Sequence, residues 1–274
     1  MAIDRLVGLP DDTSMTPNPA RMYDYILGGN HNTEADRIAA EQARAVYPDM
    51  PLVFQANRAF LRRAVLYLAG QGIDQFLDVG SGIPTVGNVH EIVQNINEDA
   101  HVVYVDVDPV AVALSTALLQ SNAQATVIQA DARDPASILD HPETRCLLDL
   151  DRPVALLLIS VLLFVPDDVE ATGLAHTFRD ALAPGSYLAL SHPVSEAITP
   201  EVMVRSEEIY ARTDRPGRSR PRAQVEDFFA GFELVEPGLV WLPLWRPEDI
   251  DDFGDLLLTE PRRSAMVGGI GRKP

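Results

Sequence analysis

Short, mostly apolar runs alternate along the chain with segments in which apolar residues recur every three or four positions. The apolar runs cover residues 75–79, 101–106, 125–131, 152–165 and 182–193. Runs with little polar alternation are typical of parallel strands buried on both faces. Between them, segments such as 109–121 have helical spacing. The pattern predicts an α/β fold with a doubly wound, Rossmann-like, mostly parallel sheet, whose strand ends share one rim.

The last third of the chain continues the pattern less regularly. Two helical segments follow residue 199, and two strand-like runs lie near 232–245 and 264–271. A doubly wound sheet often carries antiparallel strands at its edge. We therefore expect this pair to form an antiparallel hairpin there, which brings the sheet to seven strands.

The most informative stretch is QFLDVGSGIP (75–84), in which a strand runs into a turn that carries two glycines. Gly80 and Gly82 let the backbone turn sharply and approach a ligand more closely than a Cβ would permit. From about residue 86 to 96, apolar residues have helical spacing. Strand, glycine turn and helix together predict a nucleotide-binding unit, with the ligand beside the helix N-terminus.

Carboxylates lie at the ends of the first three predicted strands. They are Asp78, Asp106 and Asp131. An acid at the end of the second strand can accept hydrogen bonds from both ribose hydroxyls. Asp131 can accept one from an adenine amino group, and Ala132 offers its backbone N–H to a ring nitrogen. Helix caps and surface turns are the alternative roles for such acids. Three of them in successive strand–helix units favour a nucleoside site.

The glycine turn also discriminates between cofactors. A dinucleotide fingerprint requires a glycine three residues after the second one, and this chain has Thr85 there, so the fit to NAD is poor. The D-V-G-S-G pattern at 78–82 instead resembles the S-adenosylmethionine-binding core of class I methyltransferases. The resemblance implies that the glycine turn faces the methionine part of the cofactor. It also implies that Asp106 holds the ribose and that Asp78 lies near the ammonium group.

The segment before the first strand predicts two helices. Pro19 can begin the first helix, Gly28 and Gly29 can end it, and a capping-box pattern at 33–36 can open the second. A helical hairpin packed on the domain is one interpretation. The other is a lid over the ligand, in which Tyr23 shields a sulfonium through a cation–π contact.

Several segments together resemble a bacterial family of S-adenosylmethionine-dependent methyltransferases of undefined substrate. They are the Y-D-Y-I-L-G-G run at 23–29 and the stretches 55–65, 76–91, 102–113 and 222–247. The resemblance spans nearly the whole chain and implies a class I fold whose N-terminal helices cover the cofactor. The predicted cofactor site comprises Tyr23, Gly28, Gly29, Asp78, Gly80, Ser81, Gly82, Asp106, Val107, Asp131, Ala132 and Ser160.

The predicted function is methyl transfer from S-adenosylmethionine to an unidentified small molecule, with S-adenosylhomocysteine as product and no metal. Alignment of the methyl donor with the acceptor can lower the activation barrier by roughly 7–11 kcal/mol, so no nucleophilic triad is needed. A general base matters only where the acceptor is protonated. His192, at the predicted end of the fifth strand and so on the ligand rim, is the first candidate. His31 in the lid is the second, and a structural role is the alternative for both.

Two other functions stay open at this point. The first is a non-catalytic protein that binds S-adenosylmethionine or S-adenosylhomocysteine and regulates a partner. It stays open because Asn30, His31, Thr33 and Leu163 stand where relatives tend to carry other residues. The second is a nicotinamide-dependent oxidoreductase, which the residue at position 85 disfavours.

The amino-acid composition limits the classes of partner that the protein can bind and the compartment in which we expect it. The formal net charge of −18 opposes binding to phosphate-rich nucleic acid. The arginine-rich segment 211–222 is interpreted as a solvated loop, with an anionic substrate as its alternative partner.

The single cysteine, Cys146, excludes an intrachain disulfide, and its apolar neighbours favour a buried thiol. No apolar run reaches membrane-spanning length and no export signal is seen, so we expect a cytoplasmic protein without a membrane partner.

Regular alternation of strands and helices, without a low-complexity linker, favours one domain. We expect a flexible lead at 1–17 and a single domain at 18–274. Within that domain, 18–70 form the helical lid, 71–198 the cofactor-binding core, and 199–274 the C-terminal helices and antiparallel edge strands. The sequence makes no prediction of the oligomeric state.

Overall fold

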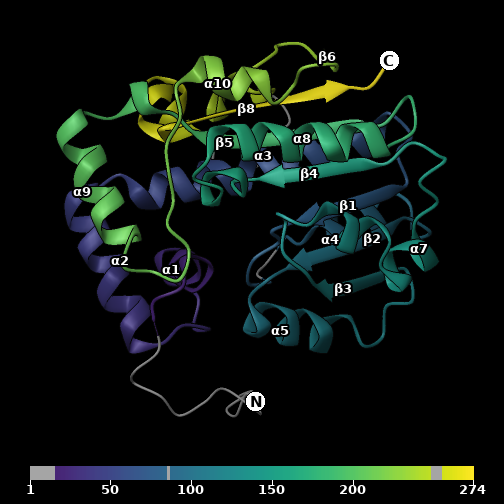
Figure 1. The fold of residues 1–274 in the computed structure, drawn as a ribbon, viewed down its shortest axis with the longest axis horizontal. Coiled ribbons are helices and arrows are strands. Elements are labelled where there is room, and N and C mark those ends of the chain that lie inside the picture. Colours follow the sequence, from purple (N-terminus) through teal and green to yellow (C-terminus); the bar gives the residue numbers. More distant parts are fainter. Residues whose placement is uncertain (1–15, 85–86, 248–254) are drawn as a thin grey trace.

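The computed structural model of the protein describes residues 16–84, 87–247 and 255–274. Most of the expected lead at 1–17 and the residue at position 85 therefore lie outside the described residues. Figure 1 shows a central sheet with helices on both faces and a further group of helices beyond the carboxyl ends of the parallel strands.

The sheet follows the order β3-β2-β1-β4-β5-β8-β6, and β7 pairs with β8 beside this path. Strands β1 to β5 run parallel, whereas β8 is antiparallel to β5, β6 and β7. The predicted doubly wound, mostly parallel sheet with seven strands on its path is thus confirmed. The strands are β1 (Gln75–Val79), β2 (His101–Asp106), β3 (Ala125–Gln129), β4 (Ala155–Ile159), β5 (Tyr187–Pro193), β6 (Glu233–Leu234), β7 (Val240–Trp241) and β8 (Met266–Arg272).

The run at 232–245 forms two short strands instead of one. Pro237 and Gly238 separate β6 from β7. Proline has no N–H to donate to a strand ladder, and Gly238 has a φ of 82°, in the left-handed region that favours glycine. The antiparallel edge of the sheet is therefore β8 with two short partners.

The helices of the described residues agree with the apolar spacing, with three differences, of which the first is that three α-helices and not two follow residue 199. The helix predicted at 58–69 is the C-terminal part of a longer helix, and the one predicted at 135–148 divides in two because Pro142 begins a new helix. The helices are α1 (Pro19–Ile26), α2 (Glu34–Val46), α3 (Met50–Gly70), α4 (Val89–Gln94), α5 (Pro109–Leu119), α6 (Pro135–Leu139), α7 (Pro142–Leu147), α8 (Asp168–Ala181), α9 (Pro200–Tyr210), α10 (Arg222–Asp227) and α11 (Asp255–Leu258).

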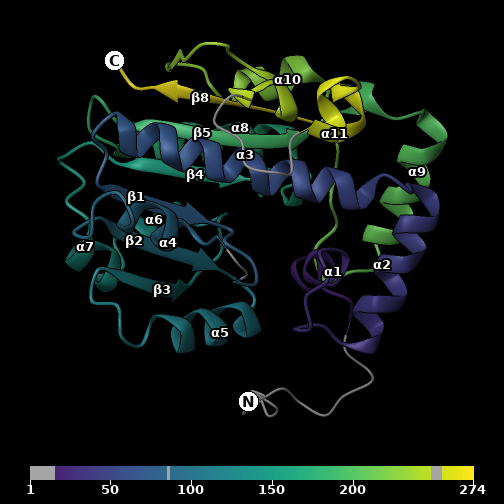
Figure 2. The ribbon, with the colours of Figure 1, turned by 180° about the vertical axis from the view of Figure 1, so that it is seen from behind.

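Alternate strand residues supply a hydrophobic core on each face of the sheet. In β1, Phe76 belongs to the core beneath α3 and α4, whereas Leu77 belongs to the core beneath α8 and α10. In β4, Leu157 belongs to the core beneath α3 and α4, and Leu156 to the core beneath α8 and α10. Both sets are buried because successive side chains of a strand point to opposite faces. Figures 1 and 2 show α8 on one face and the long helix α3 on the other.

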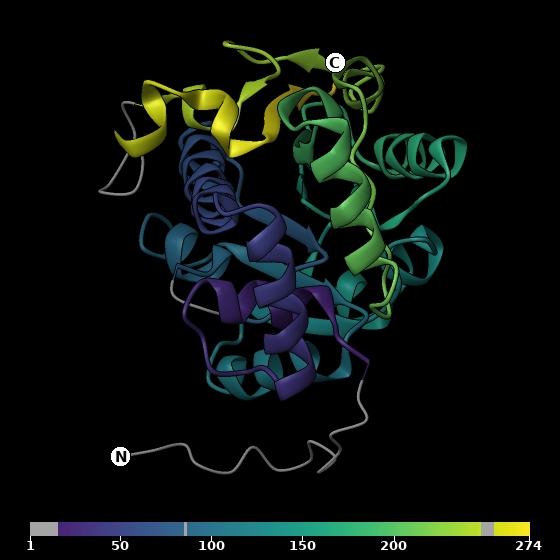
Figure 3. The same ribbon diagram turned by 90° about the vertical axis from the view of Figure 1, so that its left-hand side faces the viewer.

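The carboxyl ends of the parallel strands face the group formed by α1, α2 and α9 (Figure 1). Asn18 caps α1 through its side chain, and the predicted capping box of α2 is present, with Thr33 and Asp36 as its members. Figure 3 looks onto this end of the molecule. The N-terminal helices thus lie over the rim where a doubly wound sheet binds its ligand.

The structure bears on the expected burial of Cys146 and on the expected lack of a membrane-spanning segment. Cys146 is exposed on α7, so the prediction of a buried thiol was wrong. Thr144 is the residue that this short helix buries, and a residue two positions further along lies on another face. No helix in the described part of the chain is long and apolar enough to cross a bilayer.

Candidate functional site

A large cavity lies at the carboxyl ends of β1 to β4, beneath α1 and the first half of α3. It contains about 1390 Å³ of empty space, open solvent at its mouth included. Except for Gly28 and Gly29, the predicted cofactor residues lie on its wall. They are Tyr23, Asp78, Gly80, Ser81, Gly82, Asp106, Val107, Asp131, Ala132 and Ser160.

The glycine turn after β1 forms the floor of the cavity. Gly80 has a φ of 75°, and a Cβ there would lie 2.5 Å from Cγ2 of Val161. The N–H groups of Gly80 and Ser81 both donate to the carbonyl oxygen of Val105, at 2.8 and 3.1 Å. These bonds hold the turn against β2. The Ser81 hydroxyl is buried and has no partner among the described residues.

Asp106 lies at the end of β2, directly beside this turn. One carboxylate oxygen accepts the N–H of Gly82 at 2.7 Å, and the other accepts the N–H of Asp108 at 2.8 Å. Burial raises the pKa of Asp106. Each oxygen retains a second lone pair. The two backbone N–H groups therefore fix the carboxylate in place while it can still accept two ligand hydroxyls.

Asp78 lies near the end of β1, on the same wall. Burial raises the pKa of this carboxyl to about 7, while the charge of Arg58 favours the ionised form and Asp106 opposes it. Arg58 also lines the cavity. A cation placed beside this carboxyl favours its ionised form.

Asp131 lies at the far end of the cavity and forms two ion pairs. Its carboxylate is 2.6 Å from Nη2 of Arg133 and 3.2 Å from Nη1 of Arg215. The hydrogen bond from the Arg133 side chain, above all, lowers the pKa of Asp131. The interpretation of 211–222 as a merely solvated loop was wrong, because Arg215 reaches this wall and Arg220 is fully buried.

Helix α1 contributes Tyr23 and Asp24 to the roof of the cavity. Tyr23 stacks on Phe54 with ring centroids 4.2 Å apart, and its hydroxyl donates to the Phe54 carbonyl oxygen at 2.9 Å. Asp24 is buried, and its Oδ2 accepts the N–H of His31 at 2.8 Å. Its Oδ1 is buried without a hydrogen-bond partner among the described residues. The roof therefore combines an aromatic ring with a buried carboxylate whose Oδ1 lies against Gly29.

Gly28 and Gly29 shape this roof from outside the cavity. Gly28 has a φ of 87°. A Cβ at position 29 would overlap the Asp24 carboxylate. The turn after α1 therefore needs both glycines, but as support for Asp24 and not as part of the cavity wall.

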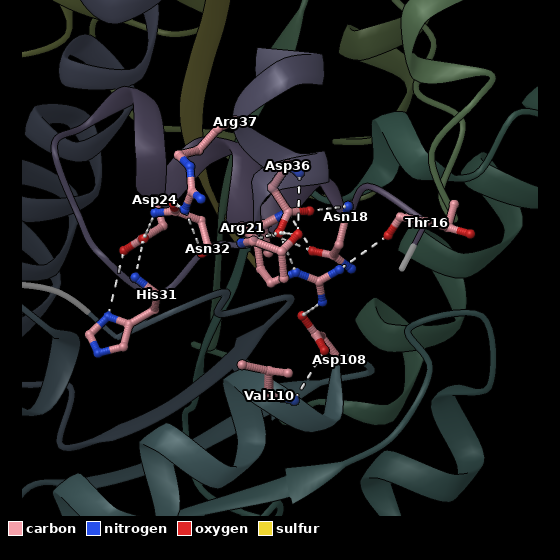
Figure 4. A network of polar contacts seen from close by, with 12 residues as sticks. Thr16, Asn18, Arg21, Asp24, His31, Asn32, Asp36, Arg37, Asp108 and Val110 are labelled. Atoms are coloured by element: carbon pink, nitrogen blue, oxygen red, sulfur yellow. Dashed lines mark hydrogen bonds and ion pairs between the residues drawn. The ribbon is translucent and has the colours of Figure 1, made fainter. Parts of the chain in front are cut away.

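A buried arginine joins the roof to the loop after β2 (Figure 4). Nε of Arg21 is 2.8 Å from Oδ2 of Asp36, and its Nη1 is 3.1 Å from Oδ2 of Asp108. Asp108 in turn donates its N–H to Asp106. The N-terminal helices and the acid at the end of β2 thus belong to one hydrogen-bonded network.

Sequence comparison identifies the family of this site. A family model described as S-adenosyl methyltransferase matches residues 11–274. The chain belongs to this family. A search of curated proteins found no match.

Two crystal structures agree closely with the fold of this family member. One is of a proposed methyltransferase from Thermobifida fusca, with 40% identity and a TM-score of 0.89, covering 98% of this chain and 99% of that one. The other is of a DUF574 family protein from Streptomyces avermitilis, with 42% identity and a TM-score of 0.88, covering 94% and 98%. The similarity therefore extends over nearly the whole chain.

The two histidines predicted as bases do not line the cavity. The prediction placed His192 on the ligand rim, but β5 continues to Pro193, and the His192 side chain is buried on one face of the sheet against Phe228 and Arg220. Its Nδ1 is 2.8 Å from the Pro193 carbonyl oxygen and its Nε2 is 3.1 Å from Nη1 of Arg220. Burial lowers its pKa to about 3. His31 lies outside the wall, with Nδ1 3.8 Å from Oδ1 of Asp24.

The cavity also contains residues that the sequence argument missed. Some adjoin predicted residues, and Arg58 lies within a stretch that carried the family resemblance. Others come from loops that only the tertiary fold brings to the rim. The missed residues that matter most are Asp24, Phe54, Asn57, Arg58, Leu163, Tyr210 and Arg215.

The residues present fit an S-adenosyl group. The Ser81 hydroxyl lines the cavity and has no partner among the described residues, so it is a polar atom that a polar ligand would satisfy. The left-handed turn at Gly80 leaves no room for a side chain and brings backbone close to the cavity. The Asp106 and Asp131 carboxylates lie on the same wall and can accept the hydrogen bonds that an adenosine with a cationic substituent would donate.

Proposed function

We propose that this protein binds S-adenosylmethionine in the cavity and transfers its methyl group to a small molecule. The observation that carries the proposal is the position of Asp106. Its carboxylate is fixed by the N–H of Gly82, and it lies on one wall with Asp131 and the glycine turn. Family membership supports the same reaction class.

We assign a role in this proposal to each group on the wall. Asp131 and the N–H of Ala132 hold the adenine, and Asp106 holds the ribose hydroxyls. The glycine turn receives the methionine part, whose ammonium group lies near Asp78. Tyr23, stacked on Phe54, covers the sulfonium with its ring.

The bound cofactor supplies a methyl group on a good leaving group. The residues of this chain hold the reacting groups in line and exclude water beneath α1. Among the described residues on the cavity wall there is no histidine, lysine or cysteine. We therefore propose catalysis by alignment, with carboxylates and tyrosines as the titratable groups near the acceptor.

Calorimetry on the full chain tests the proposal. We expect S-adenosylhomocysteine and S-adenosylmethionine to bind at one site per chain and NAD to show no heat of binding. The proposal fails if neither S-adenosyl compound binds, or if NAD binds more tightly.

Turnover then separates catalysis from simple binding. Formation of S-adenosylhomocysteine is measured against a panel of phenols, amines and carboxylic acids. Methyl transfer is confirmed if S-adenosylhomocysteine forms with one of these acceptors only when the enzyme is present. Tight binding without turnover on any acceptor would favour a regulatory protein that only holds the cofactor.

A further inference from the structure

A second cavity lies between α3 and α9, above the carboxyl end of β5. It contains about 770 Å³ of empty space, open solvent included. Figure 3 shows the two helices on either side of this region, α3 in blue-purple and α9 in green. We call it the α3–α9 cavity.

The α3–α9 cavity adjoins the cofactor cavity. Four residues line both of them: Phe54 on α3, Ser160 and Leu163 after β4, and Tyr210 at the end of α9. Ser160 has a φ of 56°, in the left-handed region. The two cavities therefore meet at a shared wall, where a molecule in one can lie next to a molecule in the other.

The strand order aligns the two cavities with the parts of the cofactor. Asp131 follows β3, Asp106 ends β2, and the glycine turn follows β1. Along the sheet the next strands are β4 and then β5. Adenine, ribose and methionine thus occupy successive strand ends, so the sulfonium lies toward β4 and the next position along the rim is the α3–α9 cavity.

The wall of the α3–α9 cavity is mostly apolar. Its buried part includes Met50, Val53, Val194 and Met266. Such a wall suits a hydrophobic molecule, since each buried CH₂ contributes about 0.8 kcal/mol. The flexible methionines adapt to different shapes of the same class.

One charge in this cavity is unmatched. Among the residues that the structure describes, the Glu207 carboxylate has no hydrogen bond or ion pair, and it is half-buried. Arg218, which also lines the cavity, donates to the Pro166 carbonyl oxygen at 2.9 Å and lies 3.4 Å from Asp168. The positive charge is therefore satisfied, and the cavity offers a carboxylate to a cation.

We propose that the α3–α9 cavity binds the methyl acceptor, and that this acceptor is a hydrophobic molecule with an amino group that pairs with Glu207. This inference rests on the proposed function. The hydrophobic body fills the space between α3 and α9. The acceptor atom lies at the shared wall, beside Tyr210 and Leu163.

Tyr210 is suited to this boundary. Its hydroxyl has no hydrogen bond among the described residues, and burial raises its pKa to about 12, so it is a neutral donor. At the boundary the lone pair of the acceptor atom forms the new bond to the methyl carbon. The carbon–sulfur bond breaks, sulfur keeps its electron pair, and a proton on the acceptor leaves to water.

The test measures binding of matched probes to the full chain saturated with S-adenosylhomocysteine. The probes are 4-phenylbutylamine, 4-phenylbutan-1-ol and 4-phenylbutanoate, which share a hydrophobic body and differ in charge. We expect the amine to bind most tightly and the carboxylate most weakly. The substitution Glu207→Gln should weaken amine binding roughly tenfold, the size of one charge-assisted hydrogen bond, and leave alcohol binding unchanged.

A second variant tests the location. Met203→Trp fills the α3–α9 cavity from α9, on a helix position that is only partly buried. It should abolish binding of the amine and the alcohol without changing affinity for S-adenosylhomocysteine. The matched control is Val204→Trp, on the neighbouring exposed position of the same helix, which should change neither.

The outcomes separate this inference from the proposed function. If S-adenosylhomocysteine does not bind to the wild-type protein, the proposed function itself fails. If it binds but the three probes show no preference for the amine, or Glu207→Gln and Met203→Trp change nothing, only the inference about the acceptor is overturned.

Discussion

The carboxylate of Asp106 accepts the N–H of Gly82 at 2.7 Å, although the two residues lie 24 positions apart. This bond joins the glycine turn after β1 to the end of β2. It sets the orientation of the acid to which we assign the ribose. The relationship ties the architecture of the sheet directly to the proposed chemistry, and the first prediction follows from it.

The substitution Asp106→Ala should weaken binding of S-adenosylhomocysteine about a hundredfold. It removes two charge-assisted hydrogen bonds, each of about 1.5 kcal/mol. Calorimetry measures the affinity, and far-ultraviolet circular dichroism verifies that the fold persists. Asp99→Ala, at an exposed turn before β2, is the control that should bind normally. Unchanged affinity in the Asp106 variant would show that the ribose lies elsewhere.

Affinity for S-adenosylhomocysteine should rise with pH and level off above about pH 7. The pKa of Asp78 is about 7 without ligand, and the ligand ammonium favours the ionised carboxylate. Below that pH binding must release a proton, so affinity falls up to tenfold per pH unit. Calorimetry between pH 5.5 and 8.5 measures this dependence. In Asp78→Asn the affinity should depend less on pH. If the pH dependence of this variant is unchanged, a group other than Asp78 titrates.

Removing the buried arginine of the roof should destabilise the protein strongly. Arg21→Met leaves the carboxylates of Asp36 and Asp108 buried without their cation, which costs about 3–5 kcal/mol. Urea unfolding measures the loss. The matched control is Arg44→Met, which breaks an exposed pair with Glu41 and should cost less than about 1 kcal/mol. Equal effects of the two substitutions would contradict a structural role for the network.

The two glycines of the turn should differ in their tolerance of alanine. Both have positive φ angles, so each substitution costs roughly 1–2 kcal/mol of backbone strain. At Gly80 the new Cβ also meets Val161, whereas at Gly82 it meets open space. Overpacking adds about 1–3 kcal/mol. In thermal unfolding, the melting temperature of Gly80→Ala should therefore be lower than that of Gly82→Ala. The reverse order would argue against the packing at Val161.

Most residues predicted for the site were found together on the cavity wall because they have local signals in the sequence. A strand that ends in an acid places that acid on the rim whatever the rest of the chain does, and Asp106 follows this rule. Asp131 follows it as well, although β3 ends two residues earlier. The left-handed glycine turn is likewise a property of a few consecutive residues.

Residues supplied by distant segments could not be predicted in this way. Arg215 and Tyr210 reach the rim because α9 and the loop after it fold over the strand ends, and no local pattern encodes that path. His192 illustrates the opposite error. Its position suggested an exposed strand end, but pairing of β5 with β8 extends through it and the side chain is buried.

A crystal structure of the full chain with S-adenosylhomocysteine tests the central claim most directly. The account predicts both ribose hydroxyls within hydrogen-bond distance of the Asp106 carboxylate, and the adenine beside Asp131. A nucleoside bound at any other place, or ribose hydroxyls that contact neither oxygen of Asp106, would contradict it.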